Sequence, residues 1–259
     1  MQTNTHNNQK LTKKERKELR RKEKEQEALM RDRSLMTKRW TKRFTIIFLI
    51  VSVIGGIFWY SSTRPTVPTN TLLTVVEDDW IKGNKEATVT IVEYLDFECE
   101  ACGAYYPVVK RLSEEFNGEV RFVSRYFPLP GHKNSQTSAL AVEAAGRQGK
   151  YWEMHDIVFE NQNSWGEKPA PTPEVFEVYA QQLNLDIDKF KQDVASQEVE
   201  DRIERDGSSG VKLGIQGTPS FFLNGEKIQN PRGYEDFKVL IQSAISKTSK
   251  EDDKLSNKN

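Results

Sequence analysis

Residues 93–102 read EYLDFECEAC and contain both cysteines of this 259-residue chain, Cys99 and Cys102. Because there is no third cysteine, a disulfide within one chain can only close this four-residue window. The entropy that a disulfide removes from the unfolded chain shrinks with loop length, so such a small ring adds little stability to a fold. The C-x-x-C spacing therefore favours redox chemistry over a purely structural disulfide.

The cysteines lie where a strand is expected to give way to a helix. Residues 88–95 are rich in β-branched and aromatic side chains and apolar on both faces, which predicts a central buried strand. Beyond the cysteines, apolar residues recur with helical spacing as far as Phe116. Unpaired amides and the dipole at a helix N-terminus stabilise a thiolate. We therefore predict that Cys99 is the attacking sulfur and that Cys102, one turn further in, is the resolving thiol.

Alternating helix and strand patterns continue to the C-terminal region. A second strand is predicted at 119–127, followed by about 80 residues that are helical throughout. Strand patterns return at 220–223 and 226–229, joined by an Asn-Gly dipeptide that is typical of a hairpin. An amphipathic helix follows at 234–245. The predicted order is β-α-β, a helical block, then β-β-α.

This order resembles the thioredoxin fold with a helical insertion, as in the DsbA-like family of extracytoplasmic thiol-disulfide oxidoreductases. The resemblance covers about residues 75–246. It rests on EYLDFECEAC at 93–102, Pro107 where thioredoxin-like helices are kinked, AAGRQGKYWEMHD at 144–156, and GTPSFFLNG at 217–225. It implies an α/β, thioredoxin-like domain at 75–248 with an all-helical insertion at about 132–213.

The resemblance also implies roles for three residues outside the cysteine pair. Glu93 matches the acidic residue that thioredoxin-like enzymes keep beneath the active site. Burial would raise its pKa and let it exchange a proton with Cys102, whereas a surface carboxylate would not. Pro219 matches the family's cis-proline, whose loop faces the cysteines; the alternative is an ordinary trans turn proline. The backbone of Thr218 would then pair with an extended substrate segment.

Asp96, Glu98 and Glu100 surround the cysteines, whereas strongly oxidising members of the family usually carry Pro-His or similar between them. A carboxylate about 7 Å from a thiolate raises its pKa by roughly 0.4 unit at the dielectric constant of water. Three carboxylates together would offset much of the helix effect, unless they are solvated surface charges. The direction of electron flow is therefore left open.

Other polar and aromatic residues are weaker candidates. His155, Trp152 and Trp165 occur at helical spacings, which favours core packing or local hydrogen bonding over catalysis. His132, before the insertion, would reach only the rim of the site. The histidines are too scattered for a zinc site within one chain, and no Rossmann fingerprint or P-loop is present. No metal or cofactor is expected beyond the redox pair.

The N-terminal part predicts a membrane anchor. Residues 44–60 read FTIIFLIVSVIGGIFWY, and the uncharged window of 44–63 would span about 30 Å as a helix. Residues 1–43 hold 15 basic against 6 acidic residues, so the positive-inside rule keeps this tail cytoplasmic and the C-terminal domain outside. We predict an uncleaved signal anchor; a buried globular helix or a cleaved signal peptide are the alternatives.

Two further segments and the basic tail complete the organisation. Residues 61–74 begin with a Pro/Thr/Ser-rich linker, and 249–259 are expected to form a disordered tail. Glutamates interleave with the basic residues of 10–33, and aromatics are absent there. This favours a topology signal near anionic lipid headgroups over nucleic-acid binding.

Together these patterns predict a single-pass protein of the cell membrane that oxidises cysteine pairs in exported proteins and is reset by a membrane redox partner. A reductase or isomerase of the same fold is the first alternative, and a reduction potential near −270 mV rather than near −120 mV would indicate it. A peptide-binding, chaperone-like module with vestigial cysteines is the second.

Overall fold

The structure is a computed structural model in which two units are distinguished, residues 1–66 and 67–259. The described residues are 18, 20–22, 24–26, 30, 40, 44–56, 59 and 69–256. Residues 44–56 are helical. None of the helices among these residues combines the length and apolar character that a membrane crossing requires. The predicted anchor at 44–60 includes positions 57, 58 and 60, which lie outside the described residues, as do most of the basic tail and 61–68. The anchor stays a prediction.

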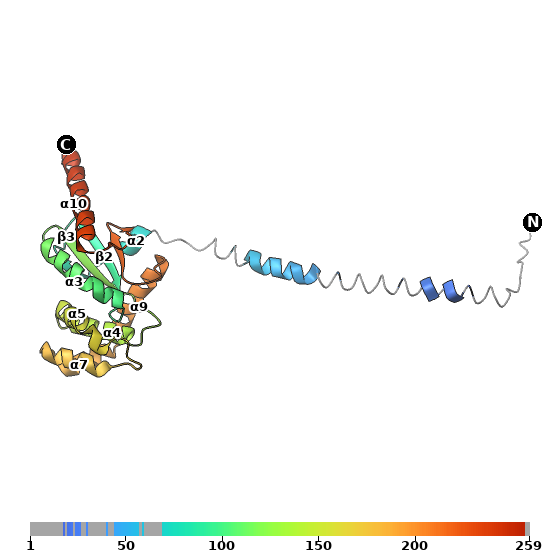
Figure 1. The fold of residues 1–259 in the computed structure, drawn as a ribbon, viewed down its shortest axis with the longest axis horizontal. Coiled ribbons are helices and arrows are strands. Elements are labelled where there is room, and N and C mark those ends of the chain that lie inside the picture. The colour runs from blue at the N-terminus through green and yellow to red at the C-terminus, as the bar shows by residue number, and fades with distance from the viewer. Residues whose placement is uncertain are drawn as a thin grey trace, which may run out of the picture. The chain divides into compact units, whose positions relative to one another are not determined.

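The second unit is built on a sheet whose strands, within residues 69–256, have the order β1-β3-β2-β4-β5 (Figure 1). The strands are β1 (Trp80–Gly83), β2 (Val89–Leu95), β3 (Val120–Tyr126), β4 (Ser220–Leu223) and β5 (Glu226–Lys227). The central strand β2 runs parallel to β3 and antiparallel to β4. All seven residues of β2 are buried, which confirms the predicted central strand.

Strand β1 has no sequence pattern that predicts it. Its four residues, WIKG, show no alternation and are all half-buried, and they pair antiparallel with β3 at the edge of the sheet. Trp80 stacks on Tyr151 with ring centroids 4.4 Å apart. Packing against the insertion therefore fixes this strand, and the order of the first half becomes β-β-α-β.

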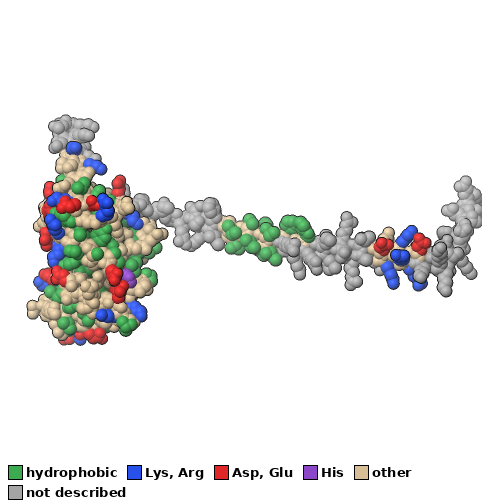
Figure 2. All heavy atoms as spheres, in the orientation of Figure 1, with side chains coloured by type: hydrophobic (Ala, Val, Ile, Leu, Met, Phe, Trp, Pro, Cys, Tyr) green, Lys and Arg blue, Asp and Glu red, His purple; other side chains and the backbone are tan. Residues whose placement is uncertain are grey.

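Helices cover both faces of the sheet. Helices α3 (Glu100–Glu115) and α10 (Tyr234–Ser256) pack on the face that carries Ile91 and Phe221. The opposite face carries Val92 and Phe222, which share a core with Leu73 of α2 (Thr69–Leu73) and with Ile215. On the face of the domain seen in Figure 2, acidic and basic side chains are interspersed.

The predicted helical block is confirmed. It consists of α4 (Ser135–Gly146), α5 (Tyr151–Glu160), α6 (Gln162–Trp165), α7 (Pro173–Gln182), α8 (Ile187–Val194) and α9 (Gln197–Lys212). Helices α4, α5 and α7 gather at one end of the domain, and α10 leaves from the opposite end (Figure 1). Asp186 caps α8 by accepting the Lys189 N–H at 3.0 Å, and Ser196 caps α9.

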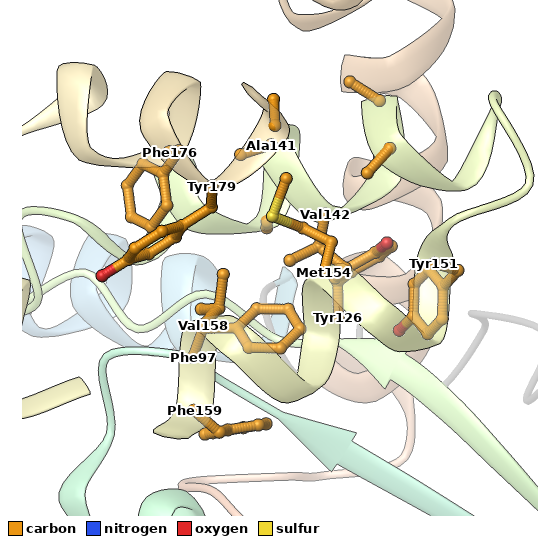
Figure 3. Packing of buried hydrophobic residues seen from close by; sticks show 14 of the residues in the cluster. Phe97, Tyr126, Ala141, Val142, Tyr151, Met154, Val158, Phe159, Phe176 and Tyr179 are labelled. Atoms are coloured by element: carbon orange, nitrogen blue, oxygen red, sulfur yellow. The ribbon is translucent and has the colours of Figure 1, made fainter. Parts of the chain in front are cut away.

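The core of the insertion reaches the loop that precedes the cysteines. Phe97, from the loop between β2 and α3, lies among Val158, Met154 and Tyr126 (Figure 3). Its ring centroid is 4.9 Å from that of Phe159 on α5. The insertion is therefore packed directly against the segment that positions Cys99.

The ends of the folded domain differ from the expectation. Leu73 is buried and the Leu72 carbonyl accepts a hydrogen bond from Arg125 at 2.6 Å, so the domain begins before position 75. Helix α10 continues to Ser256, through most of the tail expected to be disordered at 249–259; positions 257–259 lie outside the described residues. Lysine and glutamate are good helix formers, which lets the docked part of α10 propagate into this segment.

Candidate redox site

The two cysteines lie at the start of α3, as predicted. Cys99 is the N-cap residue with extended backbone angles, φ −68° and ψ 119°, and Cys102 lies in the first turn. Both are free thiols. Cys102 is completely buried, whereas Cys99 retains 8% of its accessible surface. One sulfur is thus accessible to a reaction partner, and the other is enclosed behind it.

The surroundings of Cys99 favour the thiolate. Its pKa falls from 9.0 to about 5, mainly because of the hydrogen bond with the Cys102 thiol. Burial opposes this, and hydrogen bonds from Thr218 and from the backbone N–H groups of Cys102 and Ala101 reinforce it. The N–H groups are those left unpaired in the first turn of a helix. The predicted low pKa of Cys99 therefore has a structural basis.

The surroundings of Cys102 favour the neutral thiol. Its pKa is raised well above 9.0, first by burial and then by the neighbouring Cys99 and Glu93. At neutral pH the reduced pair therefore consists of one thiolate and one thiol. This asymmetry is the one expected if Cys99 attacks and Cys102 resolves; the two roles stay a prediction.

The loop before β4 closes the site from the other side. The Thr218–Pro219 peptide is cis, as the resemblance implies. The carbonyl oxygen of Thr218 lies 3.4 Å from the sulfur of Cys99. The Thr218 hydroxyl is buried and has no other hydrogen-bond partner among the described residues. Asn230 donates a hydrogen bond to the Pro219 carbonyl at 2.8 Å and so helps to hold the loop.

Glu93 lies beneath the cysteines in the buried strand β2, where it pairs with Ser124 of β3 and Phe221 of β4. Among the described residues its carboxyl accepts no hydrogen bond and forms no ion pair. Burial alone raises its pKa from 4.5 to about 8. The predicted burial is confirmed, so Glu93 is not a surface carboxylate. Its role in proton transfer stays a prediction.

Two of the three acidic residues near the cysteines have a different role from the one expected. The Asp96 carboxylate accepts hydrogen bonds from the backbone N–H groups of Glu98 at 2.8 Å and Leu129 at 2.9 Å. The Glu98 carboxylate accepts them from Asn134 at 2.5 Å and Glu167 at 2.9 Å. Both carboxylates are buried: Asp96 stabilises the loop after β3, and Glu98 stabilises two loops of the insertion. They do not offset the effect of the helix, because the pKa of Cys99 remains low.

The remaining candidates fall into two groups. His132 reaches the site through Asp96, with 2.7 Å between its Nδ1 and the carboxylate; burial opposes its protonation, but this contact raises its pKa overall. Trp152, His155 and Trp165 take part in the core of the insertion, as predicted. Within the part of the chain that the structure describes, no cluster of three metal-ligating side chains occurs.

Gln162 is a site residue that no sequence signal indicated. From the short helix α6, its side-chain amide donates hydrogen bonds to the carbonyls of Phe97 at 2.7 Å and Cys99 at 2.9 Å. The Gln162 side chain lies directly against Gly103, where a Cβ would collide with it. A glycine in the first turn of α3 therefore allows the insertion to hold the backbone of Cys99.

Comparison with known proteins agrees with this geometry. Residues 75–243 match the family model described as Thioredoxin. A probable disulfide bond formation protein D of Bacillus cereus is 31% identical over 171 residues, which cover 64% of this chain and 78% of that protein. The crystal structure of α-DsbA1 from Wolbachia pipientis superposes with a TM-score of 0.65 at 24% identity, covering 71% of this chain and 98% of that one. The latter match supports the fold.

Matches to longer proteins are confined to part of their length. Na⁺/H⁺ antiporter NhaA 3 of Salinispora tropica is 37% identical over 169 residues, which cover 65% of this chain. The same match covers only 25% of the antiporter. The chain thus spans about a quarter of the length of this relative.

Proposed function

This chain belongs to the thioredoxin family, in its DsbA-like branch of thiol-disulfide oxidoreductases, and on that premise we propose that it oxidises cysteine pairs in exported proteins. A substrate thiolate attacks Cys99 in the Cys99–Cys102 disulfide, and Cys102 leaves as a thiolate. The second substrate thiol then attacks the substrate sulfur of the mixed disulfide and releases the Cys99 thiolate. The substrate gains a disulfide, and the pair is left reduced.

The opposed pKa values of the two cysteines carry this proposal. A thiol with a low pKa is a good leaving group in exchange, so the mixed disulfide with Cys99 resolves toward the oxidised substrate. The same stabilised thiolate favours the reduced form of the pair, which makes the disulfide form an oxidant. A pKa of about 5 for Cys99 lies between those of thioredoxin, about 7, and DsbA, about 3.5.

The size of this effect gives an expected reduction potential. Lowering a thiol pKa from 7 to 5 stabilises the reduced form by about 2 kcal/mol at pH 7, or about 50 mV for two electrons. Thioredoxin has a potential of about −270 mV and DsbA one of about −120 mV. We expect this chain to lie between about −220 and −120 mV, on the oxidising side.

Glu93 is proposed as the group that moves the proton of Cys102. When the substrate opens the disulfide, the carboxyl of Glu93 donates its proton to the Cys102 thiolate, and it takes the proton back when the disulfide reforms. A pKa of about 8 suits both directions near neutral pH, because neither proton transfer is strongly uphill.

Thr218 and Pro219 are proposed to receive the substrate. The Thr218 carbonyl lies beside the Cys99 sulfur, just before β4 begins at Ser220. An extended segment of substrate that pairs with the backbone at this point would bring a cysteine to the sulfur. Such pairing uses only the backbone groups of the substrate and does not depend on its side chains, which suits a protein that acts on many sequences.

The membrane anchor and the redox partner belong to the same proposal. The apolar segment 44–60 and the basic residues before it support a single-pass protein with its N-terminus in the cytoplasm. The redox domain would then meet exported proteins outside the membrane. A membrane-bound oxidant would accept two electrons from the reduced pair and restore the disulfide.

The reduction potential of the full-length chain in detergent tests the proposal. It is measured by equilibration with mixtures of reduced and oxidised glutathione. A value between about −220 and −120 mV supports the oxidase. A value near −270 mV favours the reductase or isomerase and overturns the direction proposed here. Full activity of Cys99→Ser would instead favour a peptide-binding module.

A further inference from the structure

A small cavity lies below the redox pair, between the sheet and helices α3 and α5. Its volume is about 30 Å³, and Glu93 of β2, Ser124 of β3 and His155 of α5 contribute polar groups to a largely apolar wall. A water molecule needs roughly 10–15 Å³ measured in this way, so the cavity has room for about two. Glu93 and His155 therefore face a common space that water can bridge.

His155 presents a free acceptor nitrogen. Its Nδ1 lies 3.0 Å from Oδ1 of Asp156. Burial opposes ionisation of Asp156, but His155 and the lysines Lys110 and Lys82 lower its pKa to about 2, so it is a carboxylate at neutral pH. Nδ1 must then carry the proton and donate to it. Nε2 is left as an acceptor without a hydrogen-bond partner among the described residues.

The charges around His155 place it between the buried carboxyl and solvent. Burial lowers the pKa of His155, while Asp156 raises it and the two lysines lower it. Lys110 lies 3.1 Å and Lys82 4.0 Å from the Asp156 carboxylate, and all three side chains are partly exposed. The titratable groups that face this region are Lys82 from β1, Glu93 from β2, Cys102, Tyr106 and Lys110 from α3, and Tyr151, Asp156 and Glu160 from α5.

We propose that His155 relays protons between Glu93 and solvent through water in this cavity. The inference rests on the function proposed above, since it supplies the route by which the Glu93 carboxyl exchanges its proton with solvent. When the disulfide forms, the Glu93 carboxyl first passes its proton through water to Nε2 of His155, and Nδ1 of the same ring releases its own proton to solvent beside Asp156. The ring then returns to its starting tautomer by proton exchange with water. The resulting Glu93 carboxylate takes the proton of Cys102, whose thiolate attacks Cys99 and expels the partner thiolate. One proton leaves for each disulfide closed.

Core packing alone does not account for the polar end of this residue. The His155 ring lies 5.0 Å from Phe159, 5.1 Å from Trp152 and 5.5 Å from Phe97, centroid to centroid. A phenyl ring would fill this aromatic surrounding without an ionisable nitrogen and without the bond to Asp156. The imidazole brings proton chemistry into an otherwise apolar cluster.

The test uses the full-length reduced chain in detergent, mixed rapidly with glutathione disulfide. Attack by Cys99 forms a mixed disulfide with glutathione, and Cys102 then closes the ring. We expect His155→Gln to leave the first step unchanged and to slow the second about tenfold between pH 6 and 7. The difference should shrink above about pH 8, because Glu93 is then already ionised before mixing.

Controls separate a relay from a packing role. Phe122→Leu removes a ring of the cavity wall, on β3, without any proton-carrying atom, and the rate of its second step should remain within about twofold of the parent. The reduction potential of His155→Gln should equal that of the parent, because a proton route changes rates and not end states. In His155→Ala, added imidazole should restore the second step.

Three results would overturn the relay. The first is an equal rate of ring closure by Cys102 in His155→Gln and in the parent from pH 6 to 8. The second is a slowing of this step in Phe122→Leu as large as in His155→Gln. The third is a reduction potential of His155→Gln that differs from that of the parent as the rate of its second step does. If the parent chain formed no mixed disulfide at all, the proposed function itself would fail, and the relay with it.

Discussion

The thioredoxin-like half of the domain and the helical insertion contribute to the redox site in different ways. Strand β2, helix α3 and the loop before β4 supply the groups proposed to take part in the reaction: Glu93, the two cysteines and Thr218. The insertion supplies groups that hold them. Gln162 binds the carbonyl of Cys99, and the backbone of Asn134 donates a hydrogen bond to the buried carboxylate of Glu98.

The difference shows how a common fold can be tuned from outside its catalytic elements. The helix N-terminus alone provides the amides that stabilise a thiolate. The insertion fixes where that N-terminus lies by packing against Phe97 and by donating hydrogen bonds from Gln162 to the carbonyls of Phe97 and Cys99. Changes in the first half should therefore abolish chemistry, and changes in the insertion should alter its rate or pKa.

The largest effect is expected from the cysteines themselves. Cys99→Ser should lose exchange with glutathione disulfide and with reduced peptides completely, because a serine hydroxyl cannot replace the thiolate. Cys102→Ser should still form the mixed disulfide but should not resolve it. Mass spectrometry of the trapped species distinguishes the two. A mixed disulfide in Cys99→Ser would reverse the assigned order of the thiols.

Glu93→Gln tests the buried acid of the first half. The pKa of Glu93 is about 8 in the folded chain and 4.5 in the reference state, so the folded state retains the proton between these values. The resulting stability is complete below pH 4.5 and is lost as pH rises through about 8. Between pH 4 and 7 the unfolding free energy of Glu93→Gln should therefore gain about 3 kcal/mol over the parent.

The measurement is denaturant unfolding of both proteins at the two pH values. Ser124→Ala, at the position paired with Glu93 in β3, serves as a control that removes a neighbouring polar group without a titrating one. An equal pH dependence in Glu93→Gln and the parent would mean that the carboxyl is not buried as described.

Gly103 and Gln162 test the contact between the two halves. Gly103→Ala places a Cβ against the amide end of the Gln162 side chain, which must move away and lose its hydrogen bonds to the carbonyls of Phe97 and Cys99, at a cost of about 1–3 kcal/mol. When Gln162 is first replaced by alanine, the same change should stabilise the chain by about 0.5–1 kcal/mol, because alanine is the better helix former. A double-mutant cycle measures this reversal of sign, and additive effects would argue against the contact.

Glu100 tests the smallest effect. It is the one acidic neighbour of the cysteines that is exposed, in the first turn of α3. Glu100→Gln should lower the pKa of Cys99 by about 0.4 unit at low ionic strength. Titration of the thiolate absorbance near 240 nm measures the shift, and added salt should reduce it. A shift of one unit or more would mean that the Glu100 charge acts on Cys99 through a medium of much lower dielectric constant than water.

Local signals in the sequence predicted the reactive half. The buried strand, the helix start at the cysteines and the loop of Pro219 each depend on residues within a short window, and the structure has all three. The insertion was predicted as helices because their periodicity and caps are also local. Its contacts with the site were not predicted, since Gln162 and Cys99 are 63 residues apart in the chain.

The direction of a charged side chain was equally hidden in the sequence. Nothing in the sequence around Asp96 and Glu98 distinguishes them from acidic residues exposed to solvent. They point inward because the backbone N–H groups of Leu129 and Asn134 donate hydrogen bonds to their carboxylates. Strand β1 was missed for a related reason. Its four residues form a strand because Trp80 packs on Tyr151, which is a tertiary contact.

The pKa of Cys99 is the quantity on which the account depends most. It is measured directly by following thiolate absorbance in the reduced full-length chain from pH 3 to 10. The structure predicts a single transition near pH 5, well separated from that of the buried Cys102. A transition near pH 9, as for an unperturbed cysteine, would contradict the proposed site and the direction of electron flow drawn from it.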